Sequence, residues 1–509
     1  MSFKLSFISI FLIVSVSLIA SEKPNVIVIL SDDQGYADAG FQEIVAPDVK
    51  TPCLDKLAKS AAVFRNAYAA SPICSTSRLA LSTGRYQQRW GGYYYGQGGL
   101  PTSEQTIAEM MLEAGYRTMK VGKTHLNNGP KQDPMKHGFE KWLGFIHHSW
   151  DFHLISDKDV AAYEKRKKGS SKSHRMSPIG PLTRNSESKE SFEGMTTTDV
   201  FRDESIKFIK EESEKPFYLQ LEFNAVHTIM TRPPNKEYAD KYGIPMRPFD
   251  RNASKWEFPH WDPDYKGGYK KWYSDVAHLK VLDPYGRKIY LAYLEQMDAA
   301  IGKIMDTLEK QGIAENTIVF FSSDNGGSHQ SYANNGKLNA YKYCVMDGGI
   351  KVPMLLSWPK KFKHSKIDSI VTHRDVFATL SEVTGVKPKK ALDGKSLLPL
   401  VEGKVKNLHT EPVFWDAAKA GWCVRHGKWK LVNIGAKTYT DFEIDENGLV
   451  TKMIPTKVIA GLKLYDLDAD PGETKNLIEK YPEIGATMEK QYKEWRSQMG
   501  DPVRGSKKK

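Results

Sequence analysis

The sequence predicts an α/β fold. A large, mostly parallel sheet would lie between helices, and a smaller C-terminal α+β subdomain would carry a short antiparallel sheet. Continuous apolar segments, typical of strands buried on both faces, alternate with segments that have helical periodicity. Each of these apolar segments ends in a cluster of polar residues. Open parallel sheets bind ligands at the carboxyl ends of their strands, so the same pattern predicts a functional site at that edge.

The first part of the chain supplies two strands and two helices. The segment 25–30 is apolar throughout and rich in β-branched residues, which predicts a buried strand. Apolar residues at helical spacing then predict a helix over 54–64. A second helix is predicted from the capping-box pattern of Thr102 and Gln105, and it leads into a strand over 116–121.

The same alternation returns in the middle of the chain. It predicts a strand over 217–223, an amphipathic helix over 289–308 and a strand over 317–321. It then stops, and short aromatic segments predict antiparallel strands and a final helix. We therefore expect three parts, namely a signal peptide over 1–20, a catalytic domain over 21–403 and a C-terminal subdomain over 404–509.

The first twenty residues have the features of a secretory signal peptide. Lys4 precedes an apolar run from Leu5 to Ala20, and a polar stretch follows. The alternative is a membrane anchor, but the run falls short of the ~20 consecutive apolar residues that a span requires. We expect an exported protein, periplasmic or secreted, without stable membrane association.

Composition excludes several classes of protein. With 40% hydrophobic and 26% charged residues, the 509-residue chain is neither globally disordered nor fibrous. Four cysteines in this length do not form a disulfide framework. The formal net charge of +12 indicates an anionic partner. The basic residues form no stripe or nucleic-acid motif, so we expect no nucleic acid, whereas sulfated or phosphorylated molecules and acidic polysaccharides remain open.

Two acidic pairs suggest a metal site. Asp32 and Asp33 follow the first predicted strand, and Asp324 and Asn325 follow the strand over 317–321. One such pair alone is more typical of a turn or a helix cap. Two pairs at two strand ends favour a hard divalent cation, because Ca²⁺ and Mg²⁺ prefer carboxylate and amide oxygens.

A cysteine motif is the most specific feature of the sequence. Cys74 is followed by Arg78 four residues later and then by Thr-Gly-Arg at 83–85. A cysteine at the start of a helix beside an arginine is either an activated thiolate or a buried, inert residue. The Ser, Thr and Arg neighbours favour the first interpretation.

These motifs resemble the formylglycine-dependent (type I) sulfatases of the alkaline-phosphatase-like superfamily. In that family a Cys-x-Pro/Ala-x-Arg motif continues to Thr-Gly-Arg, and its cysteine is oxidised to formylglycine. Cys74, Arg78 and 83–85 match it, while Thr76 stands where the family has Pro or Ala. Further segments resemble the family in the same order, and they cover nearly the whole mature chain: 23–35, 115–125, 224–227, 323–327, 342–353 and 464–473.

The resemblance implies a metal-bound nucleophile. Ca²⁺, with Mg²⁺ as the alternative, would be held by residue 74 together with Asp32, Asp33, Asp324 and Asn325. The aldehyde at position 74 would hydrate to a geminal diol, one oxygen of which would attack the sulfur. A formylglycine-generating maturation enzyme is then an implied partner.

The resemblance also implies roles for the surrounding cations and histidines. Arg78 would orient the diol, and Lys123 and Lys342 would stabilise charge on the sulfuryl oxygens. His227 would protonate the departing alcohol. His125 would take the proton from the second diol oxygen, which would release sulfate and restore the aldehyde.

The function that follows is an exported sulfatase acting on sulfate monoesters, with a sulfated carbohydrate as its substrate. An algal galactan and a host glycosaminoglycan are comparable alternatives, and an aromatic-rich segment over 232–275 is expected to form an ordered lid. Two rivals remain: a phosphonate monoester or phosphodiester hydrolase of the same superfamily, and a catalytically silent, carbohydrate-binding relative in which Cys74 stays a thiol. Candidate substrate contacts are His147, His148, Trp150, Arg232, Trp422 and Arg425.

Overall fold

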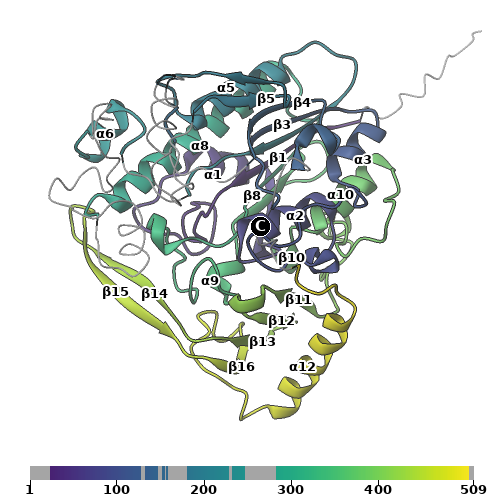
Figure 1. Ribbon diagram of the computed structural model, residues 1–509, viewed down its shortest axis with the longest axis vertical. Coiled ribbons are helices and arrows are strands. Elements are labelled where there is room, and N and C mark those ends of the chain that lie inside the picture. The colour runs from purple at the N-terminus through teal and green to yellow at the C-terminus, as the bar shows by residue number, and fades with distance from the viewer. Residues whose placement is uncertain are drawn as a thin grey trace, which may run out of the picture.

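The computed structural model describes residues 23–127, 132–146, 152–154, 156, 158, 180–227, 232–246 and 283–503 (Figure 1). The predicted signal peptide lies outside these residues, and so does most of the predicted lid. Among the residues that are described, no helix has both the length and the hydrophobicity needed to cross a membrane.

The predicted α/β architecture is confirmed. Ten strands form one sheet in the order β10-β2-β9-β8-β1-β7-β3-β4-β5-β6. Their bounds are β1 Asn25–Ser31, β2 Ala61–Tyr68, β3 Arg117–Lys123, β4 Lys141–Phe145, β5 Leu182–Arg184, β6 Ser188–Glu190, β7 Phe217–Glu222, β8 Thr317–Ser323, β9 Met354–Ser357 and β10 Ser365–Thr372. The central strand β1 pairs in parallel with β7 and β8, whereas β9 runs antiparallel between β2 and β8.

The central strands are apolar because both of their faces are covered. Every residue of β7 and β8 is buried, and β1 is buried except at its first residue. In register, Ile27 lies between Leu219 of β7 and Val319 of β8. Side chains from alternate positions therefore enter two separate hydrophobic cores, one on each face of the sheet.

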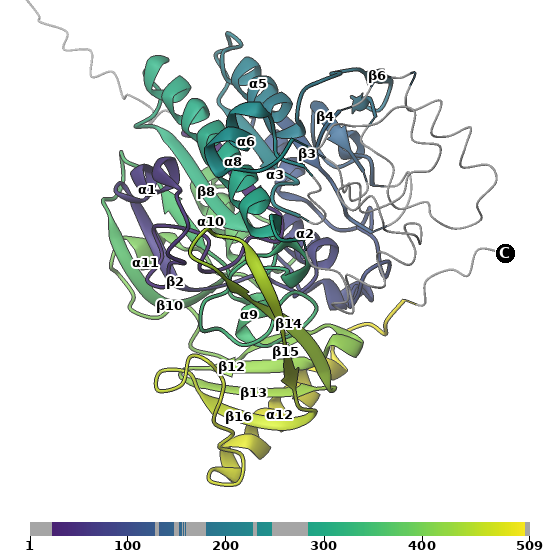
Figure 2. The same ribbon diagram turned by 90° about the vertical axis from the view of Figure 1, so that its left-hand side faces the viewer.

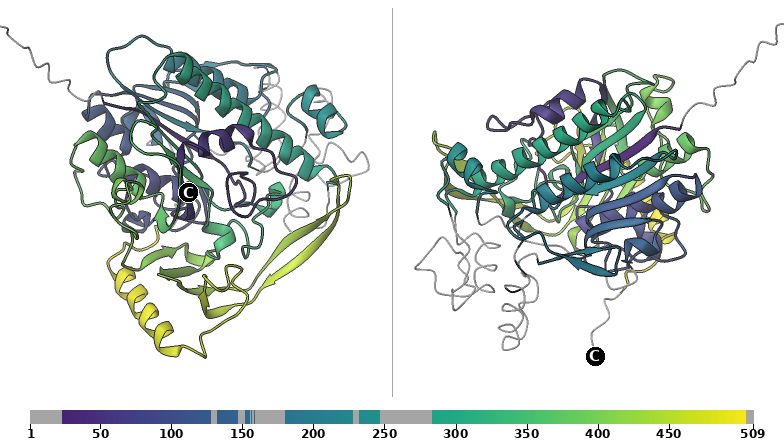
Figure 3. Two further views of the ribbon diagram at one scale, coloured as in Figure 1. Left: turned by 180° about the vertical axis from the view of Figure 1, so that it is seen from behind. Right: turned by 90° about the horizontal axis from the view of Figure 1, so that it is seen from above.

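Two layers of helices cover these faces (Figure 3). One core is built on helices of the first layer, which are α1 Pro52–Ala58, α5 Thr197–Ile209 and α8 Gly286–Lys310, with α6 Lys236–Tyr242 packed on α8. The other core is built on α2 Cys74–Thr83, α3 Ile107–Glu113, α10 Asp375–Thr384 and α11 Leu398–Val401. A further short helix, α9 Asp347–Ile350, follows β8 and precedes β9 along the chain.

Two local predictions are wrong. The predicted helix over 54–64 ends as α1 at Ala58, and β2 begins at Ala61, so Phe64 belongs to a strand. A strand that is buried on both faces is apolar at every position, so it also has apolar residues three and four positions apart, as an amphipathic helix does. The capping box is formed four residues later than predicted, with Thr106 Oγ1 accepting from Glu109 N (3.1 Å) and Glu109 Oε2 accepting from Thr106 N (2.8 Å).

The predicted antiparallel strands and final helix follow the large sheet (Figure 2). They comprise β11 Val413–Asp416, β12 Trp422–His426, β13 Trp429–Ile434, β14 Lys437–Ile444, β15 Val450–Val458, β16 Gly461–Asp466 and α12 Pro482–Ser497. Four of these strands form one antiparallel sheet in the order β11-β12-β13-β16, and α12 packs against it. The β14–β15 hairpin extends from it to the start of α8, where Val450 N donates to Pro284 O (2.9 Å). The boundary at residue 403 stays a prediction.

A buried ion cluster attaches the C-terminal sheet to the rest of the chain. Lys430 of β13 pairs with Asp347 of α9 (2.6 Å) and with Glu473 (2.7 Å). Glu473 also accepts a hydrogen bond from the backbone of Asp347 (2.7 Å), and Tyr68 of β2 donates to the Asp347 carboxylate (3.0 Å). One ammonium group therefore compensates two buried carboxylates that belong to different parts of the fold.

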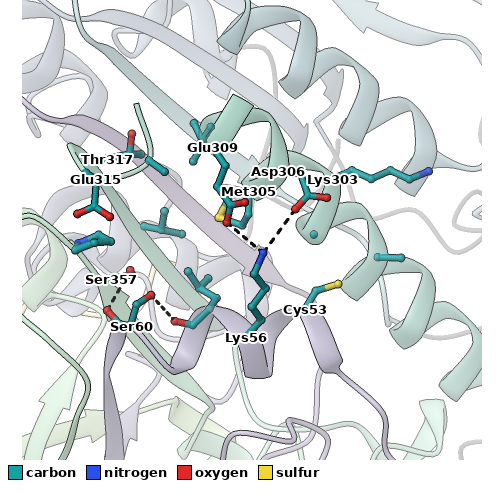
Figure 4. A pocket seen from close by; sticks show the side chains of 17 residues that line it. Cys53, Lys56, Ser60, Lys303, Met305, Asp306, Glu309, Glu315, Thr317 and Ser357 are labelled. Atoms are coloured by element: carbon teal, nitrogen blue, oxygen red, sulfur yellow. Dashed lines mark hydrogen bonds and ion pairs between the residues drawn. The ribbon is translucent and has the colours of Figure 1, made fainter. Parts of the chain in front are cut away.

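A cavity of about 500 Å³ lies between α1, α8 and the start of β8 (Figure 4). Lys56 of α1 spans its side with ion pairs to Asp306 (3.9 Å) and Glu309 (3.1 Å) of α8. Thr317, which begins β8, lines the cavity, whereas Asp324 follows the other end of that strand. Seven residues of strand separate the two ends by roughly 23 Å.

Replacing Lys430 by Met is expected to destabilise the protein by about 3–5 kcal/mol, because two buried carboxylates lose their counter-charge. Urea denaturation followed by circular dichroism measures this. Lys428→Met is the matched control, since Lys428 is half-exposed and pairs with Asp466 (2.7 Å) at the surface. Equal midpoints for the two variants would contradict the role given to Lys430.

Candidate active site

The carboxyl ends of four neighbouring strands meet at one edge of the large sheet. Asp32 and Asp33 follow β1, and Asp324 follows β8. Lys123 is the last residue of β3, and Glu222 is the last residue of β7. The predicted site residues therefore come together because their strands are adjacent and parallel.

The two acidic pairs form a single buried cluster. The backbone N–H of Asp33 donates to Asp324 Oδ1 (3.2 Å), and the Asn325 amide donates to Asp33 Oδ1 (2.8 Å). Asp32 Oδ1 and Asn325 Oδ1 are buried and have no hydrogen-bond partner within the described part of the chain. Unsatisfied buried oxygens of this kind fit a hard divalent cation. Oxygens of Asp32 and Asp324 also lie within 4.8 Å of the Cys74 sulfur.

Three basic side chains compensate these carboxylates. Lys342 Nζ lies 2.6 Å from Asp33 Oδ1, Arg78 lies 2.8 Å from Asp324 Oδ2, and Lys123 contacts Asp32. Burial raises the pKa of Asp33, but Lys342 and His227 outweigh it and hold this pKa below its ordinary value. The edge of the sheet is thus a dense set of alternating charges shielded from water.

Arg78 joins helix α2 to two strands. Besides Asp324, its guanidinium contacts Glu222 Oε2 (2.6 Å), and Glu222 also pairs with Lys120 (2.9 Å). Burial opposes the charge on Arg78, yet the surrounding carboxylates raise its pKa above the ordinary value. Glu222 and Lys120 were not predicted from the sequence. Both could have been found as charged residues within strands that are otherwise apolar.

Cys74 begins α2 and is almost fully buried. Its sulfur lies 3.3 Å from Nδ1 of His125. Burial raises the pKa of the thiol even though Lys342 and Lys123 act in the opposite direction. An unmodified Cys74 is therefore a protonated thiol and a weak nucleophile. Thr76 closes the preceding loop, because its hydroxyl contacts Ser71 Oγ (2.7 Å) and the Ile73 carbonyl (3.1 Å).

The two predicted histidines contact different groups of the cluster. His125 contacts the cysteine sulfur, whereas His227 Nε2 lies 3.6 Å from Asp33 Oδ2. Asp33 and His125 also have left-handed backbones, with φ of 61° and 43°. Such conformations are strained for residues with a Cβ and concentrate at functional sites. The proton-transfer roles of His125 and His227 stay predictions.

His373 is a further residue that sequence reasoning missed. It follows β10 and links the first turn of α2 to the end of β8, through Ser77 Oγ (3.2 Å) and Ser322 Oγ (3.0 Å). Burial lowers the pKa of His373 to about 4, so its ring is neutral at physiological pH. The available signal was its position directly after a strand.

The predicted substrate contacts are dispersed. His147, His148 and Trp150 lie outside the described residues, and Arg232 is half-buried shortly before α6. Trp422 is partly buried and stacks on Tyr492 of α12 with ring centroids 3.9 Å apart, and the substrate contact predicted for it stays a prediction. Arg425 is buried beside a separate pocket, between the large sheet and β12.

Relatives share this architecture. The sulfatase family model matches residues 24–386, and the model of the N-sulphoglucosamine sulphohydrolase C-terminal region matches 340–447. Human N-acetylgalactosamine-6-sulfatase is 28% identical over 485 residues, covering 89% of this chain and 81% of the relative. The crystal structure of Ps i-CgsB with k-i-k-neocarrahexaose has a TM-score of 0.74 at 27% identity and covers 94% of each chain.

The phosphonate monoester hydrolase of Agrobacterium radiobacter has the same fold. It aligns with a TM-score of 0.57 at 18% identity, covering 94% of this chain and 96% of its own. This identity is too low to indicate a shared activity. The family model, in contrast, covers most of the chain, including the two acidic pairs, the cysteine motif and both predicted catalytic histidines. The chain belongs to the sulfatase family, and like its named relatives it is a hydrolase of sulfuric esters.

Proposed function

We propose that this sulfatase is exported and hydrolyses sulfate monoesters of a carbohydrate, using formylglycine at position 74 and Ca²⁺ at the acidic cluster. The observation that carries the proposal is the position of Cys74. It begins a helix whose Arg78 is bound to the acidic cluster, and its sulfur lies within reach of two of the acidic residues. The same edge of the sheet also holds Lys123 and Lys342.

The acidic cluster has the donor set for Ca²⁺. Asp32, Asp33, Asp324 and Asn325 would hold the ion, because they provide oxygen donors, two of which are unsatisfied in the described residues. When bound, the cation withdraws charge from sulfuryl oxygens and holds the nucleophile. Mg²⁺ is the alternative ion, and it demands a stricter octahedral geometry.

The environment of Cys74 favours a modified residue over a thiol nucleophile. Burial raises the pKa of the thiol, so little thiolate is present at neutral pH. A hydrated aldehyde at this position supplies a hydroxyl as the attacking group. We propose that a formylglycine-generating enzyme acts on the motif, in which Thr76 takes the place of the usual Pro or Ala.

The surrounding side chains have distinct tasks in this proposal. Arg78 orients residue 74 through its fixed position between Asp324 and Glu222. Lys123 and Lys342 place positive charge near the sulfuryl oxygens, where they stabilise the negative charge of these atoms. His227 donates a proton to the departing alcohol, and His125, which contacts the atom at position 74, accepts the proton released there.

The substrate class rests on the relatives and on the N-terminus. One relative is named for N-acetylgalactosamine-6-sulfate chemistry, and another was solved with k-i-k-neocarrahexaose. We therefore propose a sulfated saccharide as the substrate, with algal galactan and glycosaminoglycan as the two classes to compare. The apolar segment from Leu5 to Ala20 supports export.

Sulfate and phosphate monoesters of one leaving group separate the leading function from its rival. We expect kcat/KM to be higher for the sulfate ester, because the buried carboxylates of Asp32, Asp33 and Asp324 offset the charges of Lys123, Lys342 and Arg78 and repel a doubly charged ester more than a singly charged one. Initial rates are measured with protein matured in a host that forms formylglycine. A preference for the phosphate ester would refute the sulfatase assignment for this site.

Mass spectrometry of the tryptic peptide that contains Cys74 tests the modification. We expect the mass of an aldehyde in place of the thiol, and loss of activity in Cys74→Ala. Cys344→Ala is the matched control, since Cys344 is also a buried free cysteine. An unmodified Cys74 in fully active protein would rule out the formylglycine mechanism, and an unmodified, inert protein would favour the silent carbohydrate-binding relative.

His227→Asn distinguishes proton donation from a structural role. The variant is expected to lose about 10²–10⁴-fold in kcat on a sugar sulfate, whose alcohol leaves only with a proton. It should lose much less on a nitrophenyl sulfate, whose leaving group is stable as an anion. His125→Asn is the comparison, and we expect it to slow both substrates alike. Equal losses for His227→Asn would contradict its assignment as the acid.

A further inference from the structure

A second polar pocket lies between the large sheet and the C-terminal subdomain. It has a volume of about 640 Å³ and is lined by the edge of the large sheet (Asn66 and 368–370) and by the turn between β12 and β13. These elements lie side by side in Figure 1. None of the metal-cluster residues lines this pocket, which we call the seam pocket.

A buried arginine in the seam pocket forms no ion pair with any described residue. Arg425 of β12 is 3% exposed, and its Nε and Nη1 have no hydrogen-bond partner among the described residues. No carboxylate in the described ranges lies within ion-pair distance of it, whereas the buried Arg78 and Arg287 are both paired with carboxylates. An isolated buried charge carries a large desolvation penalty, so this guanidinium is built for an anion that the chain itself does not supply.

Three nearby carboxylates are already engaged, and Asp468, a fourth that lines the pocket, forms no ion pair with Arg425. Asp347 is bound by Lys430 (2.6 Å) and Tyr68 (3.0 Å), Asp368 is paired with Arg65, and Asp375 is contacted by His409 (3.0 Å). They therefore leave the Arg425 guanidinium without a partner.

A further cation approaches the seam from the large sheet. Lys351 Nζ donates to Oδ1 of Asn66 (2.9 Å), and the Asn66 side chain lines the seam pocket. Arg425 and Lys351 both lower the pKa of Asp347, which shows that they contribute positive potential at the same place. The seam pocket is thus polar, is lined by Arg425, and has a second cation, Lys351, bound to one of its lining residues.

We propose that the seam pocket is a second sulfate-binding site, in which Arg425 holds the sulfate group through its Nε–H and Nη–H donors. A planar guanidinium donates two parallel hydrogen bonds to an oxyanion, which adds geometric selection to the charge. The choice of sulfate over another oxyanion rests on the proposed function. The group is either inorganic sulfate or a sulfate ester on a saccharide chain bound along the seam.

Selenate, which scatters anomalously and replaces sulfate, shows the site directly. In crystals soaked with selenate we expect an anomalous peak beside Arg425 in the wild type and none in Arg425→Gln. Arg202→Gln is the matched control, because Arg202 is paired with Asp199 (2.5 Å) and Asp203 (2.7 Å) on α5. A wild-type crystal without this peak, or an Arg425→Gln crystal that keeps it, would overturn the proposal.

Thermal unfolding keeps the test independent of crystals and of activity. Removing an unpaired buried charge leaves Arg425→Gln at least as stable as the wild type without sulfate, whereas added sulfate stabilises it less than the wild type at matched ionic strength. A variant that is much less stable without sulfate would show that Arg425 is already satisfied within the fold, and the proposal would fail.

Calorimetry separates the two sources of the anion. In a Cys74→Ala background, which prevents turnover, we compare inorganic sulfate, a sulfated oligosaccharide and the same oligosaccharide desulfated. If Arg425→Gln lowers the affinity for both inorganic sulfate and the sulfated oligosaccharide by at least about tenfold, the site binds a sulfate group carried by a saccharide. If the affinity falls for inorganic sulfate alone, the site binds the free anion. Unchanged affinities for both overturn the proposal. None of these readouts needs catalysis, so failure here is distinct from failure of the proposed function.

Discussion

The buried contact of Arg78 with Asp324 and Glu222 is the interaction on which the active site depends. It joins the second turn of α2 to the ends of β7 and β8, so the residue at position 74 is fixed relative to the acidic cluster. His373 fixes the first turn of the same helix through Ser77 and Ser322. The proposed nucleophile at position 74, held in this way, loses little entropy when the substrate arrives, which is a large part of the advantage of a preorganised site.

The same edge of the sheet illustrates how a folded chain tolerates many buried charges. Each carboxylate there is paired with a cation that lies outside its own strand. Lys342 pairs with Asp33, and Lys120 pairs with Glu222. The C-terminal subdomain repeats the principle, because Lys430 bridges Asp347 and Glu473. Since Asp347 begins α9 only five residues after Lys342, the subdomain also supports the loop that carries Lys342, the cation for which we propose sulfate binding.

The sequence was sufficient for the fold class and for the residues that gather at the sheet edge, because strands such as 25–30 are apolar and end in polar residues. It was insufficient where two patterns coincide. Phe64 fits a helical spacing and a buried strand equally well, and Thr102 resembles a capping residue as closely as Thr106 does. Strand order, including antiparallel β9 between β2 and β8, depends on contacts distant in sequence. Glu222 and His373 were missed because their importance lies in partners that only the fold brings near.

The burial of Cys74 has a consequence for the order of events in the life of the protein. Cys74 begins a helix and is 3% exposed, and Thr76 ties the preceding loop to that helix through Ser71 and Ile73. Burial to this degree leaves the Cys74 side chain far less accessible to a second enzyme once α2 has docked on the sheet. Any chemical conversion of Cys74 is therefore easier on an unfolded chain, so maturation competes in time with folding, and a rapidly folding chain would trap its own unmodified form.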